Sequence, residues 1–201
     1  MKKLYSNFTT FEDIKSLGLG VKRQKLFEQI APIEPSDFLI QTLKINREIP
    51  MESEKAKSEL LITPILNEVR IQHSRRFTFF SGYQFNVDSS RGLKGFCDYL
   101  ISSKEDAIFI ESPLIAVVEA KHNQDLPDAA PQCIAEMYAA QIFNEKNNES
   151  QKYIYGVITT GYDWLFLKLE NSTVYFSPTD RYFLNNLPEL LGVWKTLLAT
   201  L

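Results

Sequence analysis

The stretch Leu114-Ile-Ala-Val-Val-Glu-Ala-Lys121 decides how this chain folds, because five consecutive apolar residues lead into a carboxylate and an ammonium group. A short continuous apolar run is typical of a strand that is buried on both faces of a sheet. Side chains alternate along a strand, so Glu119 and Lys121 should lie on one face and Ala120 on the other. The charged pair predicts either a functional site at the end of the strand or a single ion pair that faces solvent.

The sequence around this strand alternates between helical and strand patterns. Helices are predicted over residues 53–70, 128–145 and 187–201, and further strands over residues 77–87, 95–102, 153–160, 164–169 and 174–176. In the first of these helices, Ser53 suits an N-cap, and Pro64 should kink the helix or start a second segment. The order of elements predicts an α/β sandwich with a central mixed β-sheet flanked by helices.

The first fifty residues have a different pattern. Within them, residues 10–46 carry apolar side chains at helical spacing, with breaks at Gly18-Leu-Gly20 and at Pro32 and Pro35. We therefore expect an N-terminal helical extension over residues 1–50 and one α/β domain over residues 51–201. The apolar residues of the extension should pack against that domain, because they would otherwise form a large exposed patch.

Composition excludes several classes of protein. Hydrophobic residues make up 44% of the 201 residues and charged residues 23%, which is ordinary for a globular chain and excludes a disordered one. No apolar run is long enough to span a membrane, no secretory signal follows Met1, and only two cysteines are present. These features predict a cytoplasmic protein with no membrane partner and no disulfide framework.

The net charge is −3, but basic and acidic residues are concentrated in different segments of the chain. Residues 70–94 contain five basic residues and one acidic residue, whereas residues 101–150 contain three basic and nine acidic residues. Such an arrangement suits a phosphate-binding rim beside a metal site, and it equally suits two solvated faces of opposite sign.

A second carboxylate can reach the end of the buried strand. Asp98 lies in Gly95-Phe-Cys-Asp-Tyr-Leu100, on the preceding predicted strand, and cross-strand adjacency can bring it next to Glu119. Two converging carboxylates form a hard-oxygen site that suits Mg²⁺, which also keeps waters and takes a substrate phosphate.

Four short motifs in this order resemble the PD-(D/E)XK nuclease superfamily, most closely the nuclease domain of type I restriction subunits and its stand-alone relatives. They are Glu54-Lys-Ala-Lys-Ser-Glu-Leu-Leu-Ile-Thr-Pro-Ile-Leu66, the segment around Asp98, the strand ending in Glu119-Ala-Lys121, and Pro131-Gln-Cys-Ile-Ala-Glu-Met-Tyr138. The resemblance covers roughly residues 53 to 170. Cys97 departs from the pattern, because it stands where the namesake proline would precede Asp98.

The resemblance implies a restriction-endonuclease-like three-layer sandwich and hydrolysis of phosphodiester bonds. Asp98, Glu119 and the backbone carbonyl of Ala120 would hold Mg²⁺ or Mn²⁺, which lowers the pKa of a bound water. Lys121 would position or help deprotonate that water, the latter only with a depressed pKa. Gln132 would orient the water or Lys121.

Glu54 and Glu59 are both candidates for the helical carboxylate of the site. The apolar stripe of this helix is centred about 50° from Glu54 and about 90° from Glu59, so Glu54 leans more toward the sheet. The distance from Glu54 to Pro64 also resembles the family pattern. Glu54 can alternatively serve as a favourable negative charge at a helix N-terminus, a role that needs no catalysis.

These features lead us to expect a metal-dependent nuclease that acts on DNA, with RNA as substrate and a homodimer left open. The alternative is a catalytically inactive nucleic-acid- or protein-binding module on the same fold. The acidic net charge favours that alternative, because general DNA-binding surfaces are usually basic.

Overall fold

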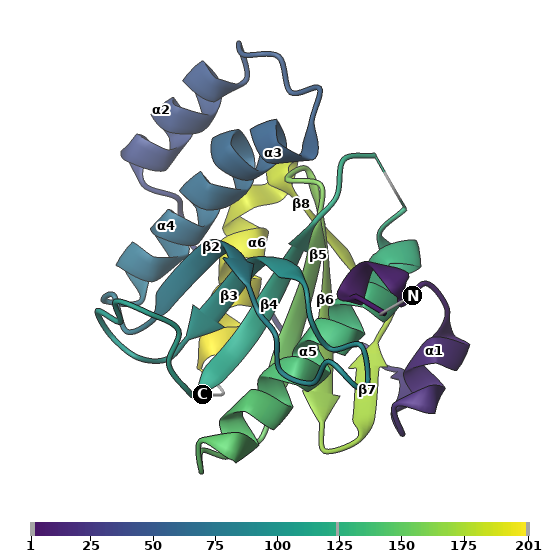
Figure 1. Cartoon of the computed structure of the whole chain (residues 1–201). Coiled ribbons are helices and arrows are strands. Elements are labelled where there is room, and N and C mark those ends of the chain that lie inside the picture. Colours follow the sequence, from purple (N-terminus) through teal and green to yellow (C-terminus); the bar gives the residue numbers. More distant parts are fainter. Residues whose placement is uncertain (1–2, 124, 200–201) are drawn as a thin grey trace.

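A central mixed sheet of eight strands forms the middle of the molecule (Figure 1). The computed structural model describes residues 3–123 and 125–199. The strands are β1 (Gly20–Arg23), β2 (Thr78–Gln84), β3 (Phe96–Ser102), β4 (Leu114–Ala120), β5 (Ile154–Thr159), β6 (Asp163–Glu170), β7 (Thr173–Phe176) and β8 (Arg181–Phe183). Their order across the sheet is β1-β7-β6-β5-β4-β3-β2, and β8 pairs with β6. The β4–β5 and β1–β7 pairs are parallel, and the remaining pairs are antiparallel.

Helices cover both faces of this sheet. They are α1 (Phe11–Ser16), α2 (Asp37–Asn46), α3 (Glu54–Lys57), α4 (Thr63–Gln72), α5 (Ala130–Lys146) and α6 (Leu187–Leu198). One apolar core joins the sheet to α5 and the N-terminal segment, and a second core on the other face joins it to α2, α4 and α6. The expected α/β architecture with a mixed central sheet between helices is therefore confirmed. In the described residues, no helix is both long enough and apolar enough to cross a membrane.

The strand that led the sequence analysis lies in the interior of the sheet. All seven residues of β4 are buried, and the strand pairs with β3 on one edge and β5 on the other. Helix α5 packs closely over this region because Gly156 of β5 has no side chain. A Cβ atom at Gly156 would lie 2.4 Å from Sδ of Met137 and 2.8 Å from Sγ of Cys133. The missing side chain thus sets how near α5 comes to the sheet.

The expected helical extension is only partly helical. Residues 11–16 and 37–46 form α1 and α2, and side chains of both segments lie in the apolar cores. The helical prediction is wrong for Gly20–Arg23, which forms β1 and pairs in parallel with β7. All four residues of β1 are exposed, so the strand carries no alternating apolar pattern that would reveal it. The sheet therefore contains residues from both sides of the expected boundary at residue 50.

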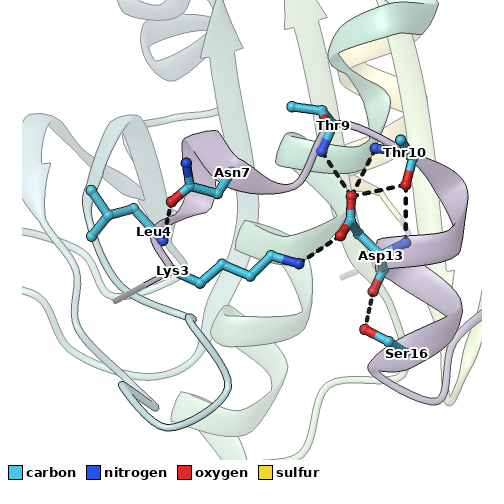
Figure 2. Close-up of polar contacts among 7 residues, drawn as sticks. All are labelled: Lys3, Leu4, Asn7, Thr9, Thr10, Asp13 and Ser16. Atoms are coloured by element: carbon cyan, nitrogen blue, oxygen red, sulfur yellow. Dashed lines mark hydrogen bonds and ion pairs between the residues drawn. The ribbon is translucent and has the colours of Figure 1, made fainter. Parts of the chain in front are cut away.

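Residues 3–16 are held together by a group of polar contacts around Asp13 (Figure 2). Thr10 caps α1, and its backbone N–H and that of Thr9 donate to Oδ2 of Asp13 at 3.0 and 3.2 Å. Lys3 adds an ion pair of 2.6 Å to Oδ1 of the same carboxylate. Capping of this kind stabilises a helix by about 1 kcal/mol and holds a short helix such as α1 in place.

The expected helix over residues 53–70 forms, with an irregular turn inside it. Ser53 caps α3 by accepting the N–H of Ala56 at 3.1 Å. A π-helical turn (Ser58–Ile62) separates α3 from α4, in which Pro64 occupies the first turn. Since proline has no N–H, the carbonyl of Leu60 loses its helical donor and accepts instead from Nδ2 of Asn46 at 2.8 Å. Pro64 thus starts a second segment, as predicted.

Candidate functional site

The functional candidates lie where β3 and β4 stop pairing. The last regular pair on this side of the ladder is Tyr99 with Val118. Beyond it, the N–H of Ala120 donates to Oδ2 of Asp98 at 2.7 Å, so a side-chain carboxylate replaces the backbone acceptor of the ladder. The N–H and C=O of one strand residue point to the same edge, which puts the carbonyl of Ala120 on the side of Asp98 as well.

Glu119, Lys121 and Gln132 form a closed set of hydrogen bonds at the end of β4. Nζ of Lys121 lies 2.5 Å from Oε1 of Glu119 and 3.2 Å from Oε1 of Gln132. Nε2 of Gln132 donates to the same Oε1 of Glu119 at 2.6 Å. Glu119 and Lys121 therefore lie on one face, as the strand period predicts, and this face is covered by α5. The side chain of Lys121 is only 14% exposed and that of Glu119 only 4%, so the pair is no solvent-facing ion pair.

Glu136 also belongs to this group, although the sequence analysis did not identify it. It lies one helical turn after Gln132 on α5, is fully buried, and accepts from Nε2 of Gln132 at 3.2 Å. Its Oε2 atom has no donor in the described residues. Burial, together with the charges of Glu119 and Asp98, raises the pKa of Glu136 well above its usual range. A neutral Glu136 can donate a hydrogen bond to Glu119. The position of Glu136 four residues after Gln132 on an otherwise apolar helix face was the available signal.

The two carboxylates at the end of the strand are held in an environment that disfavours their charge. Burial, with the charge of Glu54, raises the pKa of Asp98 to about 6, against the hydrogen bond from Ala120. Burial, with the charge of Asp98, raises the pKa of Glu119 to about 7, so its desolvation outweighs the attraction to Lys121. Asp98 and Glu119 are thus near enough to influence one another.

The surroundings of Lys121 favour its charged form, unlike those of the two carboxylates. Burial alone would lower its pKa, but the charge of Glu119 and the hydrogen bond to it raise the pKa of Lys121 above the ordinary value. The depressed pKa that a general base would need is therefore absent, and Lys121 is a cation at neutral pH. The sequence expectation of a proton-accepting Lys121 is not supported by its surroundings.

Of the two helical carboxylates, Glu54 is the one near the site. Its charge raises the pKa values of both Asp98 and Lys121, whereas Glu59 is exposed and pairs with Lys55 at 3.8 Å. The hydroxyl of Tyr99 donates to the carbonyl of Ser58 at 3.0 Å and ties this helical segment to β3, next to Asp98. This bond holds the π-helical turn, and with it α3 and Glu54, close to the end of the β3–β4 pairing.

A cavity of about 530 Å³ opens beside Lys121 and Gln132. Its opposite wall is made by residues 6–12 of the N-terminal segment, which the contacts of Figure 2 hold in place. Lys121 and Gln132 thus border a space large enough for a small ligand. The N-terminal segment, for which the sequence analysis gave no site role, helps to enclose this space.

Metal-binding capacity here rests on two side chains and the backbone. Within residues 3–123 and 125–199, no three His, Cys, Asp or Glu side chains gather into a group that could hold a metal ion. Asp98, Glu119 and the carbonyl of Ala120 remain as oxygen donors, a set that suits a hard cation which keeps several waters.

Comparison with known proteins finds no family model and no curated protein that matches the chain.

Proposed function

We propose that this chain is a metal-dependent nuclease that hydrolyses phosphodiester bonds in DNA, on a PD-(D/E)XK, restriction-endonuclease-like fold. The proposal rests on one observation above all. A largely buried Lys121 is bonded to Glu119 and Gln132 at the point where β3 and β4 stop pairing and Asp98 accepts the N–H of Ala120. The fold of a strand end does not require a largely buried cation together with two carboxylates, because desolvating such groups is unfavourable and their pairing only partly offsets that cost.

The residues present fit a divalent cation. Oδ1 of Asp98 makes no hydrogen bond within the described part of the chain, and the carbonyl of Ala120 lies on the same strand edge. Burial raises the pKa values of both carboxyl groups, and the charge of Asp98 raises that of Glu119 further, a repulsion that a bound cation would relieve. Asp98, Glu119 and the carbonyl of Ala120 would hold Mg²⁺ or Mn²⁺. When bound, the ion supplies Lewis-acid activation of a water and neutralises charge on the phosphate.

The chain's own groups have separate roles in this proposal. Lys121, as a cation, attracts the phosphate and restrains Glu119 in one orientation. Gln132 holds both of these side chains through its amide, and Glu136, as a neutral acid beneath them, keeps a proton on the buried side of Glu119. Glu54 contributes negative charge at the rim. Proton removal from the attacking water falls to a carboxylate or to bulk water rather than to Lys121.

A nucleic-acid-binding module without catalysis is the second candidate. Two observations favour it, the absence of a three-side-chain metal group in the described residues and the partial neutralisation of Glu119 by Lys121. The two candidates differ in whether the carboxylates take part in bond cleavage.

Incubation with supercoiled plasmid separates them. We expect the parent protein to nick the plasmid in Mg²⁺ or Mn²⁺ and to be inactive in EDTA, and Asp98→Asn and Glu119→Gln to be inactive in both. Glu145→Gln, which alters an exposed carboxylate at the far end of α5, is the matched control and should cleave like the parent. A parent that binds DNA yet leaves every form of it intact would establish the binding module instead.

A further inference from the structure

A second hollow lies on the other side of the strand end, immediately after Lys121. Its volume is about 390 Å³, within the range of sites that take one small ligand. Its walls come from the segment after α2, from α3, from His122 and from Tyr162 in the β5–β6 turn. Because His122 follows Lys121 directly in the chain, a nucleotide strand with one phosphate held at Lys121 can extend into this hollow.

One wall of the hollow is a fixed structural element. Lys57 is 6% exposed, and its Nζ donates to the carbonyl of His122 and to Oδ1 of Asn123, the latter at 3.0 Å. These bonds attach the segment after Lys121 to α3. Lys57 therefore forms part of the wall of the hollow, and its ammonium group is bonded to the protein rather than held ready for a ligand.

The hollow also contains polar groups that the protein does not use. Arg47 is exposed, and its guanidinium group makes no ion pair or hydrogen bond in the part of the chain that the structure describes. The imidazole of His122 makes no hydrogen bond there either, and its Nδ1 atom is buried. Glu52 is the one carboxylate in the lining. A free guanidinium group beside an unpartnered imidazole favours an anion such as a phosphate.

An aromatic ring is held rigidly at the rim. Tyr162 keeps 43% of its surface exposed, and its hydroxyl lies 3.4 Å from Sδ of Met51. The turn that carries it is tight. The N–H of Gly161 (φ of 84°) donates to Oγ1 of Thr159 at 2.8 Å, and the indole N–H of Trp164 donates to the carbonyl of Gly161 at 3.2 Å. A fixed, exposed ring is a surface on which an unpaired base can stack.

The two hollows around the strand end differ in charge. Among the described residues, the hollow beside Gln132 is lined by the carboxylates of Glu12 and Asp128 and by one cation, Lys121, whereas the hollow beside His122 is lined by Arg47 and Lys57 against Glu52. A phosphate chain that passes Lys121 is therefore favoured on the side of Arg47.

We propose that the hollow bounded by Arg47, His122 and Tyr162 binds one unpaired nucleotide of the substrate strand, with its phosphate on Arg47 and His122 and its base on the Tyr162 ring. The inference rests on the proposed function and makes it more specific. The substrate is then single-stranded, or unpaired next to the bond that is cut, because a base within a closed duplex has no free face to stack on Tyr162.

Binding of a short fluorescein-labelled oligothymidine, measured by anisotropy in EDTA, tests this apart from cleavage. We expect Arg47→Ala to weaken binding about 5-fold or more and to reduce the dependence of log Kd on log salt by about one unit. Tyr162→Leu should weaken binding about 5-fold or more, whereas Tyr162→Phe, which keeps the ring, should stay within about 2-fold of the parent. Lys44→Ala on the exposed side of α2 is the matched control and should also stay within about 2-fold.

The outcomes separate this inference from the nuclease proposal. If Arg47→Ala binds no more weakly than Lys44→Ala, or Tyr162→Leu binds like the parent, the subsite is wrong even in a protein that cleaves DNA. A parent that fails to bind the oligothymidine also overturns it. If the expected losses appear in a protein that never cleaves DNA in Mg²⁺ or Mn²⁺, the subsite stands and the nuclease proposal falls. Thermal melts of each variant check that these surface changes leave the fold intact.

Discussion

The N–H of Ala120 donates to Oδ2 of Asp98 at 2.7 Å, and this bond marks the point where the sheet becomes a site. Up to the pair of Tyr99 and Val118, β3 and β4 are joined by backbone hydrogen bonds, so their backbone groups are not free to bind a ligand. One residue further, a carboxylate takes the place of a carbonyl, and the end of β4 carries Glu119 and Lys121 on the face beneath α5. The same contact lets a stability measurement report on the site.

Asp98→Asn should stabilise the protein. The pKa of Asp98 is raised on folding from 3.8 to about 6, so its contribution to stability is full below the unfolded pKa and is lost as pH rises through the folded value. At about pH 8 the parent carries the whole penalty of an ionised Asp98, which asparagine removes. We expect a gain on the order of 1–3 kcal/mol there and a clearly smaller gain at about pH 4.5.

Denaturant melts at the two pH values measure this gain. Asp163→Asn is the control, because Asp163 is paired with Arg181 at 2.8 Å and its loss should lower stability instead. An Asp98→Asn variant that is less stable than the parent at about pH 8 would mean that Asp98 is a paired structural residue.

Millimolar Mg²⁺ or Mn²⁺ should raise the melting temperature of the parent. A ligand that binds only the folded state stabilises it by mass action, by about 2.7 kcal/mol at a hundredfold excess over Kd. Asp98→Asn has one carboxylate fewer and should gain much less. Scanning calorimetry with each ion and with EDTA makes the comparison, and equal shifts in the two proteins would contradict a site at Asp98.

Lys121→Met should destabilise the protein more at high pH than at low pH. Removal of the cation leaves Glu119 buried and unpaired, at a loss on the order of 3 kcal/mol while Glu119 is ionised. The pKa of Glu119, already raised to about 7, should rise further, so the loss diminishes as pH falls through it. The double variant Lys121→Met with Glu119→Gln should recover most of the stability. If the double variant is no more stable than Lys121→Met, the two side chains are not coupled.

Gly156→Ala should loosen α5 from the sheet. An added Cβ would lie within 3 Å of Sδ of Met137 and Sγ of Cys133, and such overpacking destabilises a core by about 1–3 kcal/mol. Activity should fall as well, because α5 carries Gln132 over Glu119. Gly20→Ala on β1 is the control, since the nearest atom to its added Cβ is 3.9 Å away. Equal melting temperatures of the two variants would contradict a close contact between α5 and β5.

The parts of the fold that the sequence predicted are those with a strong local pattern. The apolar run of β4 is visible in the sequence because all its residues are buried, and the helical spacing of α5 is visible because one side of the helix packs on the sheet. The edge strand β1 and the three-residue β8 were not predicted. Their pairing depends on partners far along the chain or on very few residues, and exposed side chains give β1 no pattern.

The candidate site was predicted to a similar extent and for a similar reason. Strand periodicity was enough to bring Glu119 and Lys121 together, and the resemblance to known nucleases supplied Gln132. Glu136 and the walls contributed by residues 6–12 and Tyr162 depend on how α5, the N-terminal segment and the β5–β6 turn pack around β4. The spacing of Glu136 four residues after Gln132 was a local signal for that residue, whereas no local sequence pattern encodes the contacts of the walls.

Whether Asp98 and Lys121 take part in phosphodiester cleavage can be measured on a short labelled DNA strand under single-turnover conditions. The parent, Lys121→Ala and Asp98→Asn would be compared in Mg²⁺, in Mn²⁺ and in EDTA, on both single-stranded and duplex DNA. We expect metal-dependent cleavage by the parent and a rate at least about 100-fold lower in both variants. Equal rates for the parent and Lys121→Ala, or no cleavage of any DNA form by the parent with either ion, would contradict this expectation.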